Sequence, residues 1–184
     1  MKRSVFIACL MILVIVFQGC NAYRETTADL SDYGRWNSFT KETLQDCFLN
    51  PLPNCETVER YGTSYYCQSI QSLLGDPNFV IHLSLQIPDE VQYQKELENF
   101  TAQLDEPVVI GAVHYYLVQC SRDDVLSYLD DEVYDGMFYN FEIISANPEE
   151  NTISFISAHV WDYVKDDYLL DLLQPISQFD SEVC

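Results

Sequence analysis

A nine-residue segment, 79–87, constrains the fold of this chain more than any other part of it. Apolar side chains occupy every second position of the segment, and polar side chains occupy three of the positions between them. The apolar residues are Phe79, Ile81, Leu83, Leu85 and Ile87, and the polar ones are His82, Ser84 and Gln86. A period of two is typical of a β-strand that has one face against a core. The segment therefore predicts a strand inside a sheet.

Other segments bring the predicted number of strands to about five, with helices between some of them. The remaining strands are predicted at 60–71, 108–120, 137–146 and 152–164, and for 66–74 a helix competes with the strand. Helices are predicted at 38–47, from Pro88 onward, from Ser121 onward and at 165–174. Proline-containing returns near 76–77 and 147–148 favour antiparallel pairing. We predict an α+β fold, with a mainly antiparallel sheet of about five strands and helices packed on one face.

The N-terminus has the organisation of an export signal. Lys2 and Arg3 supply positive charge, and an apolar run from Val5 to Phe17 follows them. A transmembrane helix needs about 20 apolar residues, so this run is too short to be one, but it suits the apolar part of a signal peptide. Gly19 then stands directly before Cys20. A small residue at this position fits the pocket of a lipoprotein signal peptidase, and the thiol can accept a diacylglyceryl group.

The sequence FQGC at 17–20 resembles the lipobox of bacterial lipoproteins. The resemblance implies cleavage after Gly19 and lipidation, with palmitate or a similar acyl chain, at Cys20. It places the protein on the extracytoplasmic side of the cell membrane. The first two positions depart from the usual pattern, in which leucine and a small residue stand there. Residues 20–22 also fit an ordinary signal peptidase, so cleavage after Ala22 stays open as the alternative.

The rest of the chain predicts one domain. We predict a signal peptide at 1–19, a lipidated cysteine with a flexible tether at 20–35, and a single α+β domain at 36–184. Residues 21–35 are mostly polar and have no apolar period. A flexible chain of that length would hold the domain on the order of 20 Å from the bilayer. The chain has 13 tyrosines and 10 phenylalanines, which supply enough apolar surface for a core.

The exported part is strongly acidic. Removal of the signal peptide leaves 7 basic residues against 29 acidic ones, a net charge of −22. Such a surface repels nucleic acid and anionic lipid headgroups, so neither is expected as a partner. It attracts basic proteins or peptides and divalent cations. High net charge is also typical of a domain that is simply kept soluble.

The cysteines outside the signal peptide, apart from Cys20, are odd in number. They are Cys47, Cys55, Cys67, Cys120 and Cys184. At least one thiol is therefore left without an intramolecular disulfide. We predict a disulfide between Cys47 and Cys55 across the proline-stiffened loop that separates them, and the other pairings stay open. No CxxC spacing occurs, which disfavours zinc ribbons and thioredoxin-like chemistry.

The histidines form the first candidate metal site. His82, His114 and His159 each lie in a predicted strand, and with Glu142 they would suit Zn²⁺ if the strands brought them to one face of the sheet. No HxH or HxxxH spacing supplies two ligands locally. A histidine in an apolar strand is more often a hydrogen-bonded structural residue.

The acidic segment 130–136 is the second candidate, for Ca²⁺. An EF-hand template that starts at Asp131 finds Asp135 at its fifth position and Glu142 at its twelfth. Its third position is Val133, which has no side-chain oxygen. Residues 137–146 also predict a strand where the motif needs a helix. No cofactor is therefore predicted, and weak binding of Ca²⁺ or Zn²⁺ stays open.

Catalytic templates do not fit the chain, which has neither a GxSxG elbow nor a phosphate-binding loop. The sequence LGDP at 74–77 before an alternating strand, followed by an acidic helix and an aromatic hairpin, resembles small uncharacterised acidic lipoproteins of Gram-positive bacteria. That resemblance implies a location and no activity. We predict a non-enzymatic, lipid-anchored protein that works by protein contact at the cell envelope. The alternatives are an immunity-type protein that neutralises a basic secreted toxin, and a small envelope hydrolase or metal-dependent enzyme.

Overall fold

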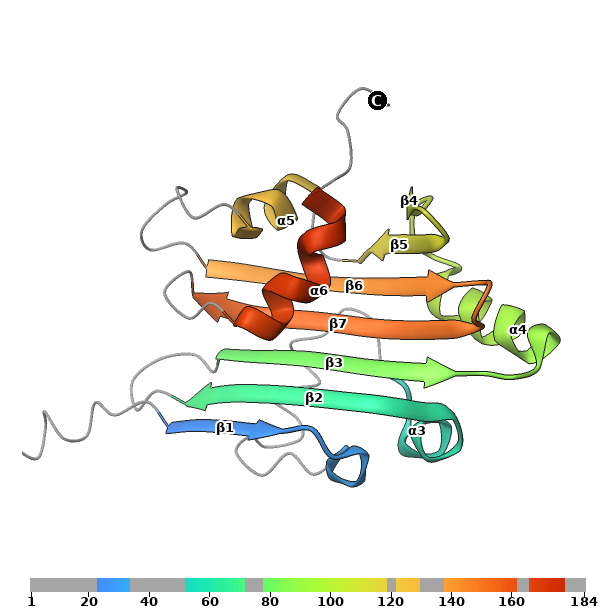
Figure 1. Cartoon of the computed structure of the whole chain (residues 1–184), viewed down its shortest axis with the longest axis horizontal. Coiled ribbons are helices and arrows are strands. Elements are labelled where there is room, and N and C mark those ends of the chain that lie inside the picture. Colours follow the sequence, from blue (N-terminus) through green and yellow to red (C-terminus); the bar gives the residue numbers. More distant parts are fainter. Residues whose placement is uncertain are drawn as a thin grey trace, which may run out of the picture.

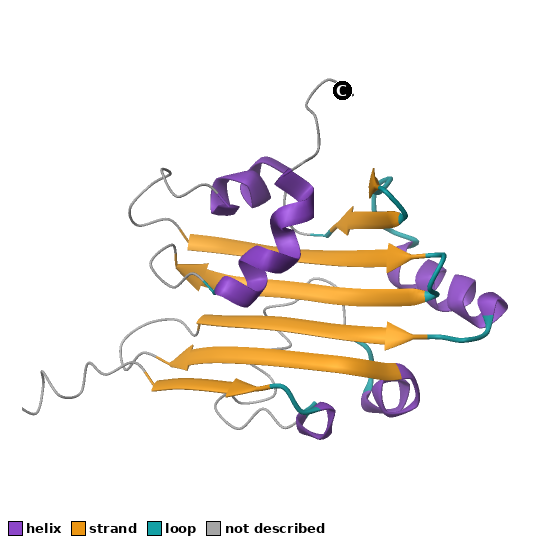
Figure 2. Cartoon of the chain, viewed as in Figure 1, coloured by secondary structure: helices purple, strands orange, loops and turns teal. Residues whose placement is uncertain are grey.

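The computed structural model describes residues 23–33, 52–71, 78–118, 122–129, 138–161 and 166–177. They form an α+β fold around one seven-stranded antiparallel sheet in the order β1-β2-β3-β7-β6-β5-β4 (Figure 1). The strands are β1 (Tyr23–Thr27), β2 (Gly62–Gln71), β3 (Asn78–Gln86), β4 (Val108–Ile110), β5 (Val113–Leu117), β6 (Phe138–Asn147) and β7 (Thr152–Trp161). The helices are the short 3-10 helix η1 (Leu30–Asp32), α3 (Cys55–Tyr61), α4 (Glu90–Thr101), α5 (Arg122–Leu129) and α6 (Asp167–Ser177) (Figure 2).

The fold class and the antiparallel pairing are as predicted, and the alternating segment forms β3. This strand pairs with β2 on one side and with β7 on the other. Its odd-numbered residues are buried in one core, whereas Val80 on the opposite face belongs to a second core. Burying a leucine or isoleucine side chain contributes roughly 1.5–3 kcal/mol, so β3 supplies a large share of the first core.

Helices pack on both faces of the sheet, and the prediction that they all lie on one face is wrong. Val58 of α3 and Tyr93 and Leu97 of α4 join the core of one face, called the α4 face below. Val125 and Tyr128 of α5 and three residues of α6 join the core of the other, called the α6 face. Figure 1 shows α6 crossing in front of β6 and β7. Two cores form because β3, β6 and β7 carry apolar residues on both faces at their central positions.

The sheet gains an unpredicted strand at each edge. Residues 23–27 belong to the segment predicted as a tether, but they form β1 and pair with β2 from Tyr23↔Gln71 to Thr27↔Cys67. Tyr33 follows and packs its ring edge-on against Tyr65, at a centroid distance of 5.4 Å. The predicted boundary at residue 36 is therefore too late, because main-chain pairing and aromatic packing tie 23–33 to the domain.

The other unpredicted strand arises from a turn inside the run 108–120. Gly111 adopts a φ of 62°, which glycine tolerates at no steric cost, and the chain reverses there between β4 and β5. The predicted single strand is thus a hairpin. Helix α6 also runs further than predicted, because Pro175 lies inside it rather than after it. The helix predicted at 38–47 lies outside the described residues.

Helix α4 begins as the sequence suggests, with one shift in position. Asp89 is its N-cap, and the carboxylate accepts a hydrogen bond from the backbone N–H of Gln92 at 2.7 Å. Pro88 therefore stands just outside the helix. Across the part of the chain that the structure describes, we find no helix with the length and apolar character needed to span a bilayer.

Candidate functional site

On β2, β3, β7 and β6, the half of the α6 face that lies toward the β6–β7 turn carries uncharged polar side chains, and we call this part the polar sheet face; its two rows continue onto β5 and β4 with apolar side chains. The antiparallel register aligns Ser64, Ser84, Ser154 and Ser145 in one row across β2, β3, β7 and β6. The next row holds Gln86, Thr152 and Asn147. Each of these seven residues is at least partly exposed. In Figure 1 no described helix crosses this half of the sheet on the α6 side.

The register explains why the polar sheet face stops where it does. The row that follows the serines toward the other end of the strands pairs His82 with Ile156, and Ile156 with Ile143. Both isoleucines are buried in the α6-side core. The apolar rows that begin here are covered by α5 and α6, whereas the serine and glutamine rows are not. A change in residue type along the strands therefore divides one sheet face into a core and an open surface.

His82 marks the border between these two halves. Its Nδ1 lies 2.7 Å from the Tyr168 hydroxyl of α6, and its Nε2 lies 3.1 Å from Ser84 Oγ. Ser84 Oγ in turn lies 2.7 Å from Ser154 Oγ. Since a neutral imidazole has one N–H, one ring nitrogen donates a hydrogen bond and the other accepts one. This chain of contacts fixes the hydroxyls at the start of the polar sheet face to the N-terminal turn of α6.

Asp166 connects the same border to two further elements. Its carboxylate accepts hydrogen bonds from the Tyr66 hydroxyl of β2 and from the backbone N–H of Leu169, each at 3.0 Å, so Asp166 caps α6. Its own backbone N–H donates to the Tyr128 hydroxyl of α5 at 3.4 Å. The rings of Tyr66 and Tyr168 pack against each other at a tilt of 31°, with a centroid distance of 4.2 Å. The network therefore sets where α6 begins over the sheet.

The contact between Ser84 and His82 has the atoms of a nucleophile and a base, but it lacks two requirements of hydrolysis. Burial lowers the pKa of His82 from 6.5 to about 4, which leaves the imidazole neutral and a weak base near pH 7. Both residues also lie on one strand, two positions apart, within a regular ladder. A strand interior presents no turned backbone N–H groups to stabilise an oxyanion, because the ladder uses them. The contacts of His82 therefore hold the Ser84 and Ser154 hydroxyls in place, and they do not form a catalytic arrangement.

Acidification is expected to destabilise the fold through His82. The folded state has a pKa of about 4 for this imidazole, and the unfolded chain has its ordinary value of 6.5. The unfolded chain therefore binds a proton first as the pH falls, so stability present above pH 6.5 is lost progressively down to pH 4. At 1.36 kcal/mol per pKa unit, the loss between pH 7 and 4.5 is about 2–3 kcal/mol.

Urea unfolding of the exported domain and of its His82→Gln variant at these two pH values checks this expectation. Carboxylates titrate in both proteins and cancel in the comparison. The parent protein should lose about 2–3 kcal/mol more stability than the variant. Equal losses would show that His82 does not titrate with a lowered pKa.

The three histidines that were candidates for a zinc site do not converge. His82 shares its face with Ile156 of the α6-side core. His159 is opposite Phe79, and His114 is opposite Ala146, and both of these partners belong to the α4-side core. His114 and His159 are also separated by about 20 Å along the strands, given about 3.3 Å per residue. Among the described residues, no three His, Cys, Asp or Glu side chains are grouped as metal ligands.

The remaining predicted residues are only partly within the described chain. Glu142 lies on β6 on the α4 face, is 5 % exposed, and stands in a strand where an EF-hand would need a helix. Asp131 and Asp135 lie outside the described residues, as do Gly19, Cys20 and Cys47. Cys55, the predicted partner of Cys47, begins α3, is exposed, and forms no disulfide with another described residue. Because Cys47 is outside the described chain, their pairing stays a prediction.

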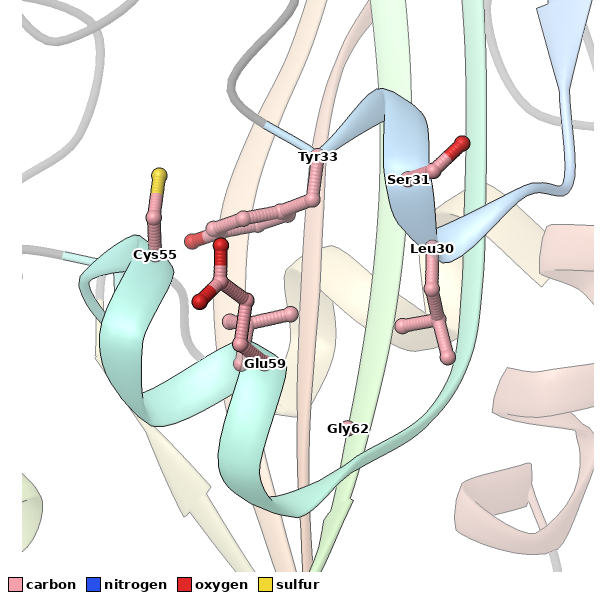
Figure 3. Close-up of a pocket in the computed structure, with 7 residues that line it drawn as sticks. Leu30, Ser31, Tyr33, Cys55, Glu59 and Gly62 are labelled. Carbon is pink, nitrogen blue, oxygen red and sulfur yellow. The ribbon is translucent and has the colours of Figure 1, made fainter.

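A pocket of about 210 Å³ lies between η1 and α3 (Figure 3). It is lined by Leu30, Ser31, Tyr33, Cys55, Val58, Glu59 and Gly62. Figure 3 shows the Tyr33 ring extending from η1 toward Cys55 and Glu59. Burial raises the pKa of the Tyr33 phenol, whose hydroxyl donates a hydrogen bond to the carbonyl of Pro53. Small-molecule sites usually enclose about 300–1,000 Å³, and this pocket is smaller and has few converging polar groups.

Sequence reasoning missed Asp166, Tyr66, Tyr168 and the serine row. Tyr66 and Asp166 stand one hundred positions apart, so no local spacing could have related them. The alternation of 79–87 did place His82, Ser84 and Gln86 on one face. Extending it to the serines of β6 and β7 required the strand register. The chain matches no family model, no curated protein and no solved structure.

Proposed function

We propose that this chain is a non-enzymatic, lipid-anchored binding protein on the extracytoplasmic side of a bacterial cell membrane, and that its contact surface is the polar sheet face. The observation that carries the proposal is the pair of uncharged polar rows on β2, β3, β7 and β6, which no described helix covers. In a sequence with 21 % charged residues and a net charge of −20, seven adjacent uncharged positions on one surface are distinctive. Depletion of charge is a property of the centres of protein interfaces.

The side chains of this surface suit adaptable recognition. Serine and asparagine are among the residues that antibody-like binding surfaces use, because they supply adaptable hydrogen bonds. Ser84 and Ser154 are already held by their mutual contact at 2.7 Å and by His82. Their hydroxyls therefore lose little freedom when a partner binds.

The proposed partner is a basic protein. Electrostatic attraction to an acidic domain accelerates encounter and favours basic partners over acidic ones, whereas the uncharged polar sheet face makes the final contact. An immunity-type protein that neutralises a basic secreted toxin is the most specific form of this proposal. The lipobox-like segment supports export and lipid attachment at Cys20. A protein anchored in this way has its binding surface outside the cell.

Affinity capture on intact cells with matched variants tests the proposal. Gln86 is exposed in the polar sheet face, and Gln94 is exposed on α4 at the opposite face of the sheet. We expect the parent protein and Gln94→Arg to recover the same basic protein in a salt-sensitive manner. Recovery by Gln86→Arg should fall at least about tenfold, since a charged side chain would be introduced into the contact.

Because both variants exchange the same residues, they change the net charge equally and differ only in their location. Equal recovery by both variants would exclude the polar sheet face as the contact surface. Recovery of an acidic partner whose binding does not depend on salt would exclude the electrostatic part of the proposal.

A further inference from the structure

The first strand of the sheet begins very close to the proposed lipid attachment point. β1 starts at Tyr23, so only Asn21 and Ala22 separate it from Cys20. A chain spans at most about 3.3–3.6 Å per residue. The Cα atom of Tyr23 therefore lies within about 11 Å of that of Cys20, whatever path the two linking residues take. This is shorter than the tether predicted from the polar composition of 21–35.

The register identifies which end of the sheet is held there. Tyr23 is opposite Gln71, the last residue of β2, and β3 begins on the same side at Asn78. The other end of the sheet holds Gln86 of β3 and the turn from β6 to β7, where Asn147 pairs with Thr152. In Figure 1 the start of β1 and the β6–β7 turn lie at opposite ends of the strands. A ten-residue strand is about 30 Å long.

We propose that the lipid at Cys20 holds the domain end-on, with the Tyr23–Gln71 end of the sheet next to the membrane and the β6–β7 turn farthest from it. This inference rests on the acylation of Cys20 in the proposed function. It assigns a membrane-facing end to the domain, which the acyl chains hold next to the headgroup layer without attraction between the headgroups and the acidic domain. The polar sheet face then lies in the half of the sheet that points away from the bilayer, where a protein from outside the cell can reach it.

Because β1 is paired with β2, a lipid attached close to β1 also restricts the orientation of the sheet relative to the membrane. An anchor joined through a flexible segment lets a domain tumble, whereas an anchor two residues from a paired strand transmits its position to the sheet. The whole sheet then takes up a preferred tilt because its strands are hydrogen-bonded to one another from β1 to β4.

Paramagnetic relaxation on phosphatidylcholine nanodiscs that contain a gadolinium-chelating lipid tests the orientation. The full acylated chain, purified from membranes with ¹⁵N and deuterium labels, is inserted through its own lipid. We expect strong relaxation enhancement of the backbone amides of Asn78 and Phe79, and weak enhancement at Asn151 and Thr152. Because the effect falls with the sixth power of distance, a strand about 30 Å long gives at least about a tenfold difference.

A spacer variant is the matched control. Inserting twelve Gly and Ser residues between Ala22 and Tyr23 leaves β1 intact but adds a flexible link of about 19 Å. The difference between the two ends should then shrink by at least about threefold.

The possible outcomes distinguish a wrong orientation from a wrong lipid anchor. Mass spectrometry of the N-terminal peptide first establishes whether the purified chain begins at an acylated Cys20. An acylated chain with equal enhancement at both ends, or with the larger enhancement at Thr152, overturns the orientation and leaves the anchor standing. A chain that begins at an unmodified Tyr23 overturns both the anchor and the orientation.

Discussion

Replacing Cys20 with serine is expected to abolish incorporation of an acyl label into the protein. A serine hydroxyl cannot form the thioether that carries the diacylglyceryl group, so no lipid is attached. One acyl chain holds a protein only marginally, with an association constant of about 10⁴ M⁻¹, and two chains hold it stably. The variant should therefore be released into the medium or remain as an unlabelled precursor. Metabolic labelling with an alkyne-bearing fatty acid, followed by detergent phase partition, measures both results.

Cys9→Ser is the matched control for this experiment. Cys9 lies in the apolar part of the signal and has the same thiol, but it is not the residue that follows Gly19. Its replacement should leave acyl labelling unchanged. Full labelling of Cys20→Ser would show that the lipid is attached to another residue, and the proposed anchor at Cys20 would then be wrong.

Asp166→Ala is expected to cause a large loss of folding stability. Asp166 is 2 % exposed, and its carboxylate accepts hydrogen bonds from Tyr66 and from the N-terminal turn of α6. Loss of a helix N-cap costs about 0.5–2 kcal/mol, and a donor left without its acceptor costs about 1–3 kcal/mol when it is fully buried and less when, like the Tyr66 hydroxyl, it is partly buried. We expect a total of about 2–4 kcal/mol, measured by urea unfolding of the exported domain.

Two neighbouring variants make this result specific. Asp167→Ala removes an exposed carboxylate from the first turn of the same helix and should cost only about 0.3–1 kcal/mol. Asp166→Asn keeps an acceptor oxygen and should fall between the two alanine variants. A midpoint for Asp166→Ala no lower than that of Asp167→Ala would mean that the Tyr66 contact and the cap contribute nothing to stability.

Predictions from local patterns succeeded where one segment supplied its own signal. The alternation of 79–87 identified β3 because burial on one face repeats every second residue, and the turn at 147–151 identified the pairing of β6 with β7. Local patterns failed to predict a strand where its formation depends on pairing with another strand that is distant in the sequence. Residues 23–27 have no apolar period, and they form a strand because β2 offers them a free edge. Gly111 could have indicated an interruption of the strand predicted at 108–120, since an isolated glycine inside a strand pattern suggests a bulge or a close backbone approach.

Less of the candidate site than of the fold could be predicted from the sequence. His82, Ser84 and Gln86 were correctly placed on one face of their strand, but their partners come from β2, β7 and α6. The register also placed His82 on one face and His159 on the other, which the positions of the histidines in the sequence cannot reveal. A shift of one residue in any strand would reverse these faces.

The α+β class, the antiparallel pairing, the acidic charge and the lipobox-like segment can be read from the amino-acid sequence, because each depends on composition or on residues that are close together in the chain. The helices on both faces, the start of β1 three residues after Cys20 and the row of serines from four strands become visible only when the chain is folded. These features depend on which strands become neighbours and in which register. Pairing between distant segments is set by the packing of the whole sheet, and no single segment encodes it.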